Sequence, residues 1–129
     1  MYKIVGVDMM NTACDCCGRE DLKMVIILRG PNGDVRFGRG CAARAMGHRR
    51  TARDIAQIAT DRTVTELRQD AYRFGNAPIG RLGYGDVRTL TDGRLYSDTA
   101  ACLTAAEVQA AYPDREWVRL NKTSWVTAA

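Results

Sequence analysis

The chain reads Cys14-Asp15-Cys16-Cys17-Gly18 near its N-terminus and Gly38-Arg39-Gly40-Cys41-Ala42-Ala43 further along. A C-x-x-C pair followed directly by glycine is typical of a tight turn, or knuckle, that directs two thiolates at one metal ion. Cys41 lies where a helix is expected to begin, and the free N–H groups at a helix N-terminus stabilise a thiolate. We therefore predict a structural zinc (Zn2+) site with Cys14, Cys17 and Cys41 as ligands.

The segment between the two cysteine groups favours a β-hairpin. Residues 22–28 are apolar and rich in β-branched side chains, residues 31–34 supply a turn with Asn-Gly at its centre, and residues 35–37 return. Knuckle, hairpin and helix, in this order, form a treble-clef zinc finger. We predict a treble-clef-like domain over residues 1–50.

Two other interpretations of the cysteines stay open. Buried free cysteines pack as small hydrophobic side chains, and paired cysteines form disulfides. Disulfides are disfavoured because five cysteines leave one unpaired, and because residues 1–7 are too short an apolar run for a signal peptide. We expect a cytoplasmic protein with reduced thiols.

The fourth metal ligand is open at this point. His48, the single histidine, would lie about 10 Å along a continuous helix from Cys41, so it could ligate only where Gly47 ends the helix and turns the chain back. Cys102 could arrive from the second half of the chain. Cys16 could coordinate only by distorting the knuckle. A carboxylate, or no fourth protein ligand, are further alternatives, and His48 could equally be a solvent-facing residue beyond the helix.

Residues 14–22 match the pattern C-x-x-C-G-R-x-x-L, and residues 38–47 match G-x-x-C-A-x-R-x-x-G. Over residues 12–48 the chain resembles a recurrent small domain of actinobacteria and their phages. The resemblance implies a zinc-finger-like module in a phage or actinobacterial protein, but it implies no activity. It carries over the same three cysteines as candidate ligands.

Residues 51–129 indicate a long helix followed by a small lobe. The helix is expected to start at Thr51, with an acidic residue at its third position, and to end at Gly75. A break near Thr63 is the alternative, since β-branched residues gather there. The lobe is expected to contain a loop over 76–85, a hairpin over 87–96, a helix over 104–112 and a strand over 116–120.

The final residues, around Trp125, are expected to be a disordered tail or to pack through that tryptophan. The fold class is therefore α+β: an N-terminal treble-clef-like finger, then a long helix, then a β-hairpin, helix and strand lobe. We expect residues 1–50 and 51–129 to pack as one compact unit. No hydrophobic run is long enough to span a membrane.

The sequence lacks the residue sets of known classes of zinc enzyme. A hydrolytic zinc site needs an open coordination position and a nearby general base, and zinc deaminases need a glutamate ahead of their Pro-Cys-x-x-Cys segment. HNH nucleases need several histidines, whereas this chain has only one. We expect a binding protein and not an enzyme.

Charge points to nucleic acid as the partner. The formal net charge is +4, but basic residues gather on and just after the expected finger, where Asp34 is the single acid between Arg29 and Arg53. Guanidinium groups on one face would bind DNA or RNA phosphates with salt-sensitive affinity, although a merely solvated basic face is an alternative. The candidate nucleic-acid-binding residues are Arg36, Arg39, Arg44, Arg49, Arg50 and Arg53.

The alternative function is a protein-interaction module that binds and modulates a host protein. Such interfaces use aromatic anchors. The candidates are Tyr96, Tyr112, Trp117 and Trp125, although burial in the core is the expected fate of Trp117 and Tyr112. The sequence does not separate this function from nucleic-acid binding.

Overall fold

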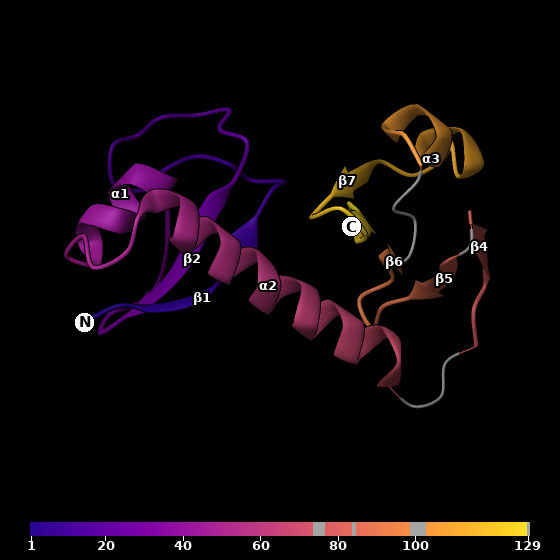
Figure 1. Cartoon of the computed structure of the whole chain (residues 1–129), viewed down its shortest axis with the longest axis horizontal. Helices are drawn as coiled ribbons and strands as arrows, with labels where there is room; N and C mark the ends of the chain where they lie inside the picture. The colour runs from indigo at the N-terminus through magenta and orange to yellow at the C-terminus, as the bar shows by residue number, and fades with distance from the viewer. Residues whose placement is uncertain (74–76, 84, 99–102, 129) are drawn as a thin grey trace. The chain divides into compact units, whose positions relative to one another are not determined.

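A computed structural model describes residues 1–73, 77–83, 85–98 and 103–128 (Figure 1). This described part contains three helices and two antiparallel sheets, so the α+β class expected from the sequence is confirmed. The chain divides into two compact units, Met1–Thr63 and Val64–Ala129. The division falls within the helix α2 (Ala52–Ala71), later than the boundary expected at residue 50, because the first part of α2 packs into the core of the first unit.

The sheet of the first unit has three strands in the order β1-β2-β3. The predicted hairpin is confirmed, with β2 (Val25–Gly30) and β3 (Gly33–Phe37) paired in antiparallel register. Gly30 already pairs with Gly33, so the connecting loop is shorter than expected. The strand β1 (Lys3–Asp8) pairs with β2 and was not expected from the sequence.

β1 carries a bulge where α2 approaches it. The register with β2 shifts between Ile4 and Gly6, and the N–H of Val7 donates a hydrogen bond of 2.8 Å to Oγ1 of Thr63 on α2. A Cβ at Gly6 would lie 2.5 Å from that same oxygen. Glycine is therefore required at this position, and the bulge lets the helix pack closely on the strand.

α2 runs unbroken from Ala52 to Ala71, without the break considered near Thr63. Its expected start is confirmed, because the N–H of Asp54 donates to Oγ1 of Thr51 at 3.1 Å, as in an N-cap. The expected end at Gly75 lies outside the described residues.

The core of the first unit joins its strands to its helices. α1 (Arg39–Ala45) and the first part of α2 contribute mainly alanines, which allow close approach to the sheet. The buried members are Ile4, Val7, Ile26, Leu28, Ala42, Ala43, Ile55, Ala56 and Ala59.

The sheet of the second unit has the strand order β4-β5-β6-β8-β7. The predicted hairpin around Asp92-Gly93 is confirmed as the pair β5–β6. The predicted helix is confirmed as α3, with a capping box between Thr104 and Glu107. The bounds are β4 (Gly80–Leu82), β5 (Gly85–Thr89), β6 (Leu95–Ser97), α3 (Ala105–Ala111), β7 (Trp117–Arg119) and β8 (Trp125–Thr127).

Two parts of the second unit differ from expectation. The segment expected as a loop over 76–85 contributes β4 and the start of β5 to the sheet. The residues expected as a tail form β8, which lies between β6 and β7 with Trp125 only 2% exposed. Of the two alternatives for this segment, packing through Trp125 is confirmed.

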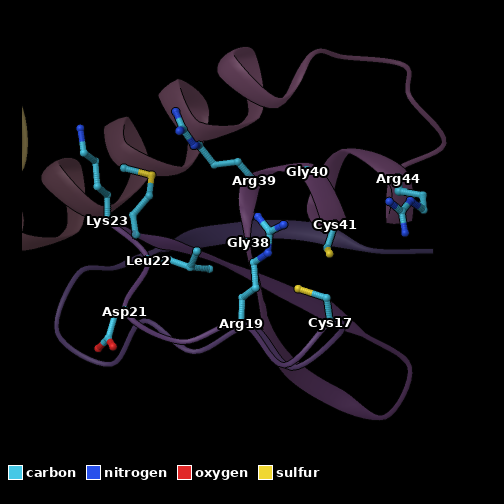
Figure 2. Close-up of a pocket in the computed structure, with 11 residues that line it drawn as sticks. Cys17, Arg19, Asp21, Leu22, Lys23, Gly38, Arg39, Gly40, Cys41 and Arg44 are labelled. Carbon is cyan, nitrogen blue, oxygen red and sulfur yellow. The ribbon is translucent and has the colours of Figure 1, made fainter.

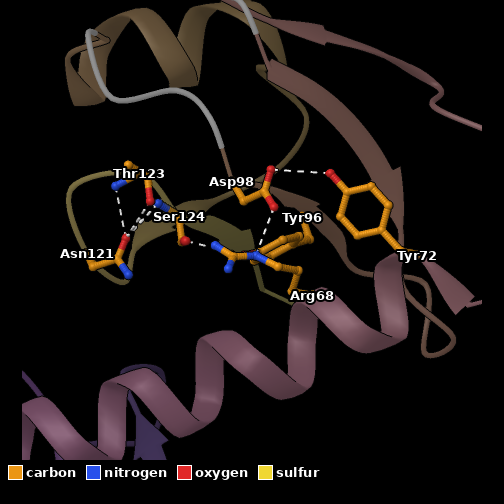
Figure 3. Close-up of polar contacts among 7 residues, drawn as sticks. All are labelled: Arg68, Tyr72, Tyr96, Asp98, Asn121, Thr123 and Ser124. Carbon is orange, nitrogen blue, oxygen red and sulfur yellow. Dashed lines mark hydrogen bonds and ion pairs between the residues drawn. The ribbon is translucent and has the colours of Figure 1, made fainter.

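The C-terminal part of α2 is held to the second sheet by polar contacts (Figure 3). Nε of Arg68 forms an ion pair of 3.0 Å with Asp98, whose carboxylate also accepts a hydrogen bond of 3.4 Å from the hydroxyl of Tyr72. Beside them, the hydroxyl of Tyr96 donates to Oγ of Ser124 at 3.3 Å. The contacts of Arg68 and Tyr72 attach the last turns of α2 to Asp98, which directly follows β6.

Candidate metal centre

The knuckle forms as the sequence predicts. The N–H of Cys14 donates to the carbonyl of Arg19 at 2.8 Å, and the N–H of Gly18 donates to the carbonyl of Cys14 at 2.9 Å. Gly18 has a φ of +75°, which glycine adopts without strain. This explains why glycine follows the C-x-x-C pair.

The second arm of the site is the first turn of α1. Gly38 is the N-cap, and Cys41 is the third residue of the helix. The N–H of Gly38 donates a hydrogen bond of 3.1 Å to Sγ of Cys14, so the helix start is joined directly to the knuckle. The expected position of Cys41 at the beginning of a helix is confirmed.

The structure brings the three predicted ligands together. The Sγ atoms of Cys14, Cys17 and Cys41 all lie within 4.8 Å of one another, and Figure 2 shows the sulfur atoms of Cys17 and Cys41 facing each other. Tetrahedral zinc with Zn–S bonds of about 2.3 Å separates its sulfurs by about 3.8 Å. A small contraction would therefore close this group around a metal ion, and the three cysteines can hold one.

Hydrogen bonds prepare Cys14 to act as a thiolate. Burial acts to raise its pKa, but the backbone N–H groups of Cys17, Gly38 and Cys16, together with the thiol of Cys17, lower the pKa to about 7. Zinc ligands must be deprotonated, so this environment favours metal uptake near neutral pH. N–H donors on a cysteine sulfur also stabilise the thiolate once it is bound to a metal.

Cys41 has the opposite environment in the metal-free site. Burial raises its pKa to about 12, and hydrogen bonds with the thiols of Cys14, Cys17 and Cys16 act in the same direction. One thiol of this cluster can lose its proton. Deprotonation of a second thiol is disfavoured by repulsion from the first thiolate, unless a cation neutralises the negative charge. A cation bound among the thiols would relieve this repulsion.

His48 is not part of this group. The N–H of Gly47 donates to Arg44 and that of His48 donates to Ala43, at 3.0 and 2.9 Å, which is a Schellman motif that ends α1. Gly47 thus ends the helix as considered from the sequence, but His48 beyond it is exposed and lies outside the group of three cysteines. The other candidate, Cys102, lies outside the described residues.

A basic cavity of about 570 Å³ opens beside the cluster (Figure 2). Cys17 and Cys41 form part of its wall, and the first turn of α1 forms another part. Asp21 is the single acidic side chain among its lining residues. The basic lining residues are Arg19, Lys23, Arg39 and Arg44.

The predicted nucleic-acid-binding arginines have different surroundings. Arg39 and Arg44 line the cavity. Arg36 is engaged elsewhere, since its Nε lies 3.2 Å from the carboxylate of Asp8. The remaining candidates, Arg49, Arg50 and Arg53, are exposed after α1.

Sequence reasoning missed Arg19 and Lys23 as members of the basic cavity. They precede β2 in a segment that also contains Glu20 and Asp21. Acidic and basic residues alternate there, so the sequence showed no cluster of positive charge. The signal that could have found Arg19 is its position directly after the Cys17-Gly18 turn, which carries it back toward the metal site.

The candidate aromatic anchors of the second unit lie mainly in its core. Tyr96 and Trp125 are buried, and Trp117 is 9% exposed. Tyr112 is partly buried, with its ring centroid 5.7 Å from that of Trp117. These aromatic residues stabilise the second unit.

Comparisons of the chain with protein-family models, with curated proteins and with solved structures gave no match. The resemblance of residues 12–48 to a domain of actinobacteria and their phages therefore stays a prediction. Within the described ranges, no helix has the length and apolar character needed to cross a membrane.

Proposed function

We propose that this protein is a non-enzymatic zinc protein whose first unit binds nucleic acid through the basic residues around the thiol cluster. The observation that carries the proposal is the cavity beside Cys17 and Cys41, whose lining contains four cationic side chains and a single acidic one. A cavity with this charge favours phosphate groups.

Zinc is the metal that this donor set suits best. Thiolates are soft ligands, and tetrahedral sites rich in cysteine select zinc over magnesium or calcium. Cys14 and Cys17 from the knuckle and Cys41 from α1 would hold it, in the order of a treble-clef-like finger. Bound zinc would cross-link the knuckle to the helix, so that metal binding contributes directly to the stability of the first unit.

The basic residues would retain an excess of positive charge after the metal binds. A zinc ion with three thiolates carries one net negative charge, and Asp21 supplies another. The cations of Arg19, Lys23, Arg39 and Arg44 outnumber them. Arg49, Arg50 and Arg53 extend the exposed basic residues beyond the end of α1.

Guanidinium groups suit this role because their planar donors form bidentate hydrogen bonds with phosphate. Such contacts position a nucleic acid without reading its bases. The exposed residues of the short helix α1 are basic or glycine, with no Asn or Gln to read base edges. We therefore propose binding that depends on the phosphate backbone more than on sequence.

The alternative function, binding and modulation of a host protein, has less support. It relied on aromatic anchors, and those residues pack in the core of the second unit. The large exposed apolar residues among those described are Met1, Met10, Tyr72 and Ile79, and none of them is one of the candidate anchors.

Fluorescence anisotropy of the zinc-loaded protein tests the proposal. Labelled duplex DNA, single-stranded DNA and RNA are titrated at low and at moderate salt. The double variant Arg39→Glu/Arg44→Glu should weaken binding by about tenfold or more and reduce the dependence of affinity on salt, since each lost phosphate contact lowers the salt slope by about 0.9. Arg81→Glu, an exposed residue on β4 of the second unit, is the control for charge reversal. Absence of binding to all three probes at low salt would overturn the proposal.

A further inference from the structure

The cavity beside the thiol cluster offers more room than a phosphate group needs. Its volume is about 570 Å³. Pockets that enclose small organic molecules measure about 300–1,000 Å³. Cationic side chains on an open surface are sufficient to neutralise the phosphates of a duplex, without a cavity of this size. The space next to Cys17 and Cys41 therefore suits a larger group than a phosphate alone.

One part of the cavity wall is apolar. Leu22 and Met24 line it, and both are partly buried. Met24 packs against the core of the first unit, and Cδ1 of Leu22 lies 3.2 Å from the position that a Cβ would take on Gly38. Both side chains are thus held by neighbouring parts of the first unit and leave an apolar surface toward the cavity. Apolar side chains in such a position pack against the flat face of an unpaired base.

The other part of the wall is cationic. Arg19 follows the turn of the knuckle, Lys23 precedes β2, and Arg39 and Arg44 belong to α1. In Figure 2 the carboxylate of Asp21, the single acidic side chain of the lining, points away from the thiols. A guanidinium group binds phosphate through its N–H donors, and its planar face stacks on a base. The cavity therefore offers partners to both a phosphate and a base.

We propose that this cavity binds one unpaired nucleotide of a single-stranded nucleic acid, with the base against Leu22 and Met24 and the phosphate among the cations. The inference rests on the proposed nucleic-acid binding and specifies the form of nucleic acid that binds best. A base within a duplex is stacked and paired, so placing it in the cavity would first cost its stacking and pairing energy. Stacking accepts every base, so this preference for single strands requires no sequence specificity.

Gly40 allows the cavity to be partly filled without a change of charge. It lines the cavity from the first turn of α1, and a Cβ on this residue would meet no heavy atom within 4 Å. Gly40→Leu therefore adds side-chain volume there without a clash with the folded chain. Gly40→Ala is the matched control, because it adds the same Cβ but little volume. Leucine and alanine both favour a helix more than glycine does, so both variants should fold.

Fluorescence anisotropy of the full-length, zinc-loaded protein at low salt tests the inference with three labelled probes of equal length. The probes are a thymidine oligonucleotide, an abasic strand with the same number of phosphates, and the duplex of the first strand with its complement. We expect the single strand to bind about tenfold or more tightly than the other two probes, which is the gain that stacking of one base provides. Gly40→Leu should remove this difference, and Gly40→Ala should keep it.

The outcomes separate the inference from the function on which it rests. Absence of binding to all three probes would overturn both. An abasic strand or a duplex that binds as tightly as the single strand would overturn the nucleotide site alone and leave phosphate binding in place. A preference for the single strand that Gly40→Leu does not change would show that the base is bound elsewhere, and it would overturn this assignment of the cavity.

Photocrosslinking of the unsubstituted protein keeps the inference testable if Gly40→Leu does not fold. A single strand that contains bromouracil is irradiated in complex with the zinc-loaded protein, and the crosslinked peptides are identified by mass spectrometry. We expect crosslinks within residues 17–24 and 38–44, which contain the residues that line the cavity. Their absence from both segments would overturn the assignment.

Discussion

The N–H of Gly38 donates to Sγ of Cys14 across 3.1 Å, so the residue that caps α1 also supports the first thiolate of the knuckle. Gly38 has φ −58° and ψ 161°, a conformation that both alanine and proline adopt. A proline would keep this backbone conformation, but its Cδ would take the place of the N–H hydrogen and push Sγ of Cys14 away.

Gly38→Pro should weaken zinc binding by about tenfold or more, because it removes a hydrogen bond to a charged sulfur and its ring displaces that sulfur. Gly38→Ala keeps the N–H and is the control, although its Cβ would lie 3.2 Å from Cδ1 of Leu22 and require a small shift of that side chain. Competition with a chelator measures both affinities. Equal affinities of the two variants would contradict this role of the N–H.

The thiols of Cys14 and Cys41 make the stability of the zinc-free protein depend on pH in two directions. Burial acts to raise the pKa of Cys14, but hydrogen bonds outweigh burial and lower this pKa from 9.0 to about 7. Its contribution to stability is therefore fully present above pH 9 and is lost as the pH falls through 7. Burial raises the pKa of Cys41 from 9.0 to about 12, so its contribution is present below pH 9 and is lost as the pH rises through 12.

We expect the free energy of unfolding of the zinc-free, reduced protein to rise between pH 7 and pH 9, by an amount on the order of 2 kcal/mol, and to begin to fall above pH 9. Urea unfolding in the presence of a chelator, from about pH 6 to about pH 10, measures it. Cys14→Ser should remove the rise on the neutral side. A flat profile would show that the thiols do not titrate in this way.

The contact between Gly6 and Thr63 predicts a coupled pair of substitutions. Gly6→Ala would place a Cβ 2.5 Å from Oγ1 of Thr63, so the strand or the helix must move. Thr63→Ala removes that oxygen but also the acceptor of the Val7 N–H. We expect Gly6→Ala to destabilise the protein by about 1–3 kcal/mol, and the double variant to be less destabilised than the sum of the single ones. Additive losses in thermal unfolding would contradict the contact.

The second unit offers a test that does not involve metal. Thr91 donates to Asp70 from its N–H, at 3.0 Å, and from its hydroxyl. These bonds hold the pKa of Asp70 below its usual 3.8, so the stability that they provide is present above that pH and is lost as the pH falls below it. Thr91→Val should cost about 1 kcal/mol at neutral pH. The difference should shrink in denaturant unfolding below about pH 4. A difference independent of pH would count against this bond.

The cluster of Cys14, Cys17 and Cys41 was the most predictable part of the molecule, because the spacing of these residues in the sequence largely determines how their side chains meet. A C-x-x-C turn and a cysteine in the first turn of a helix determine where their sulfurs point, with few other contacts required. The basic lining of the neighbouring cavity was harder to predict. Arg19 and Lys23 stand beside Glu20 and Asp21 in the sequence, so only the folded chain separates the basic side chains that line the cavity.

Tertiary contacts explain the elements that the sequence did not predict. β1 contains Gly6 at a bulge, which interrupts the alternation that would have identified a strand. The β-branched residues near Thr63 made a break in α2 the alternative to one long helix, yet Thr63 is where that helix contacts β1. Likewise Trp125 looked like part of a polar tail, but it belongs to a strand that only the completed sheet makes stable.

α2 supplies residues to both compact units, and this has a consequence for folding cooperativity. Isolated helices shorter than about 12–15 residues are marginal in water, so each portion of α2 depends on the other to propagate its hydrogen bonds. Fraying of Ala52–Thr63 would therefore remove the helical template from Val64–Ala71, which carries Arg68 toward Asp98. The second unit contains none of the clustered cysteines Cys14, Cys17 and Cys41. Its stability is nevertheless linked, through the continuous backbone of α2, to the order of the first unit, which contains all three.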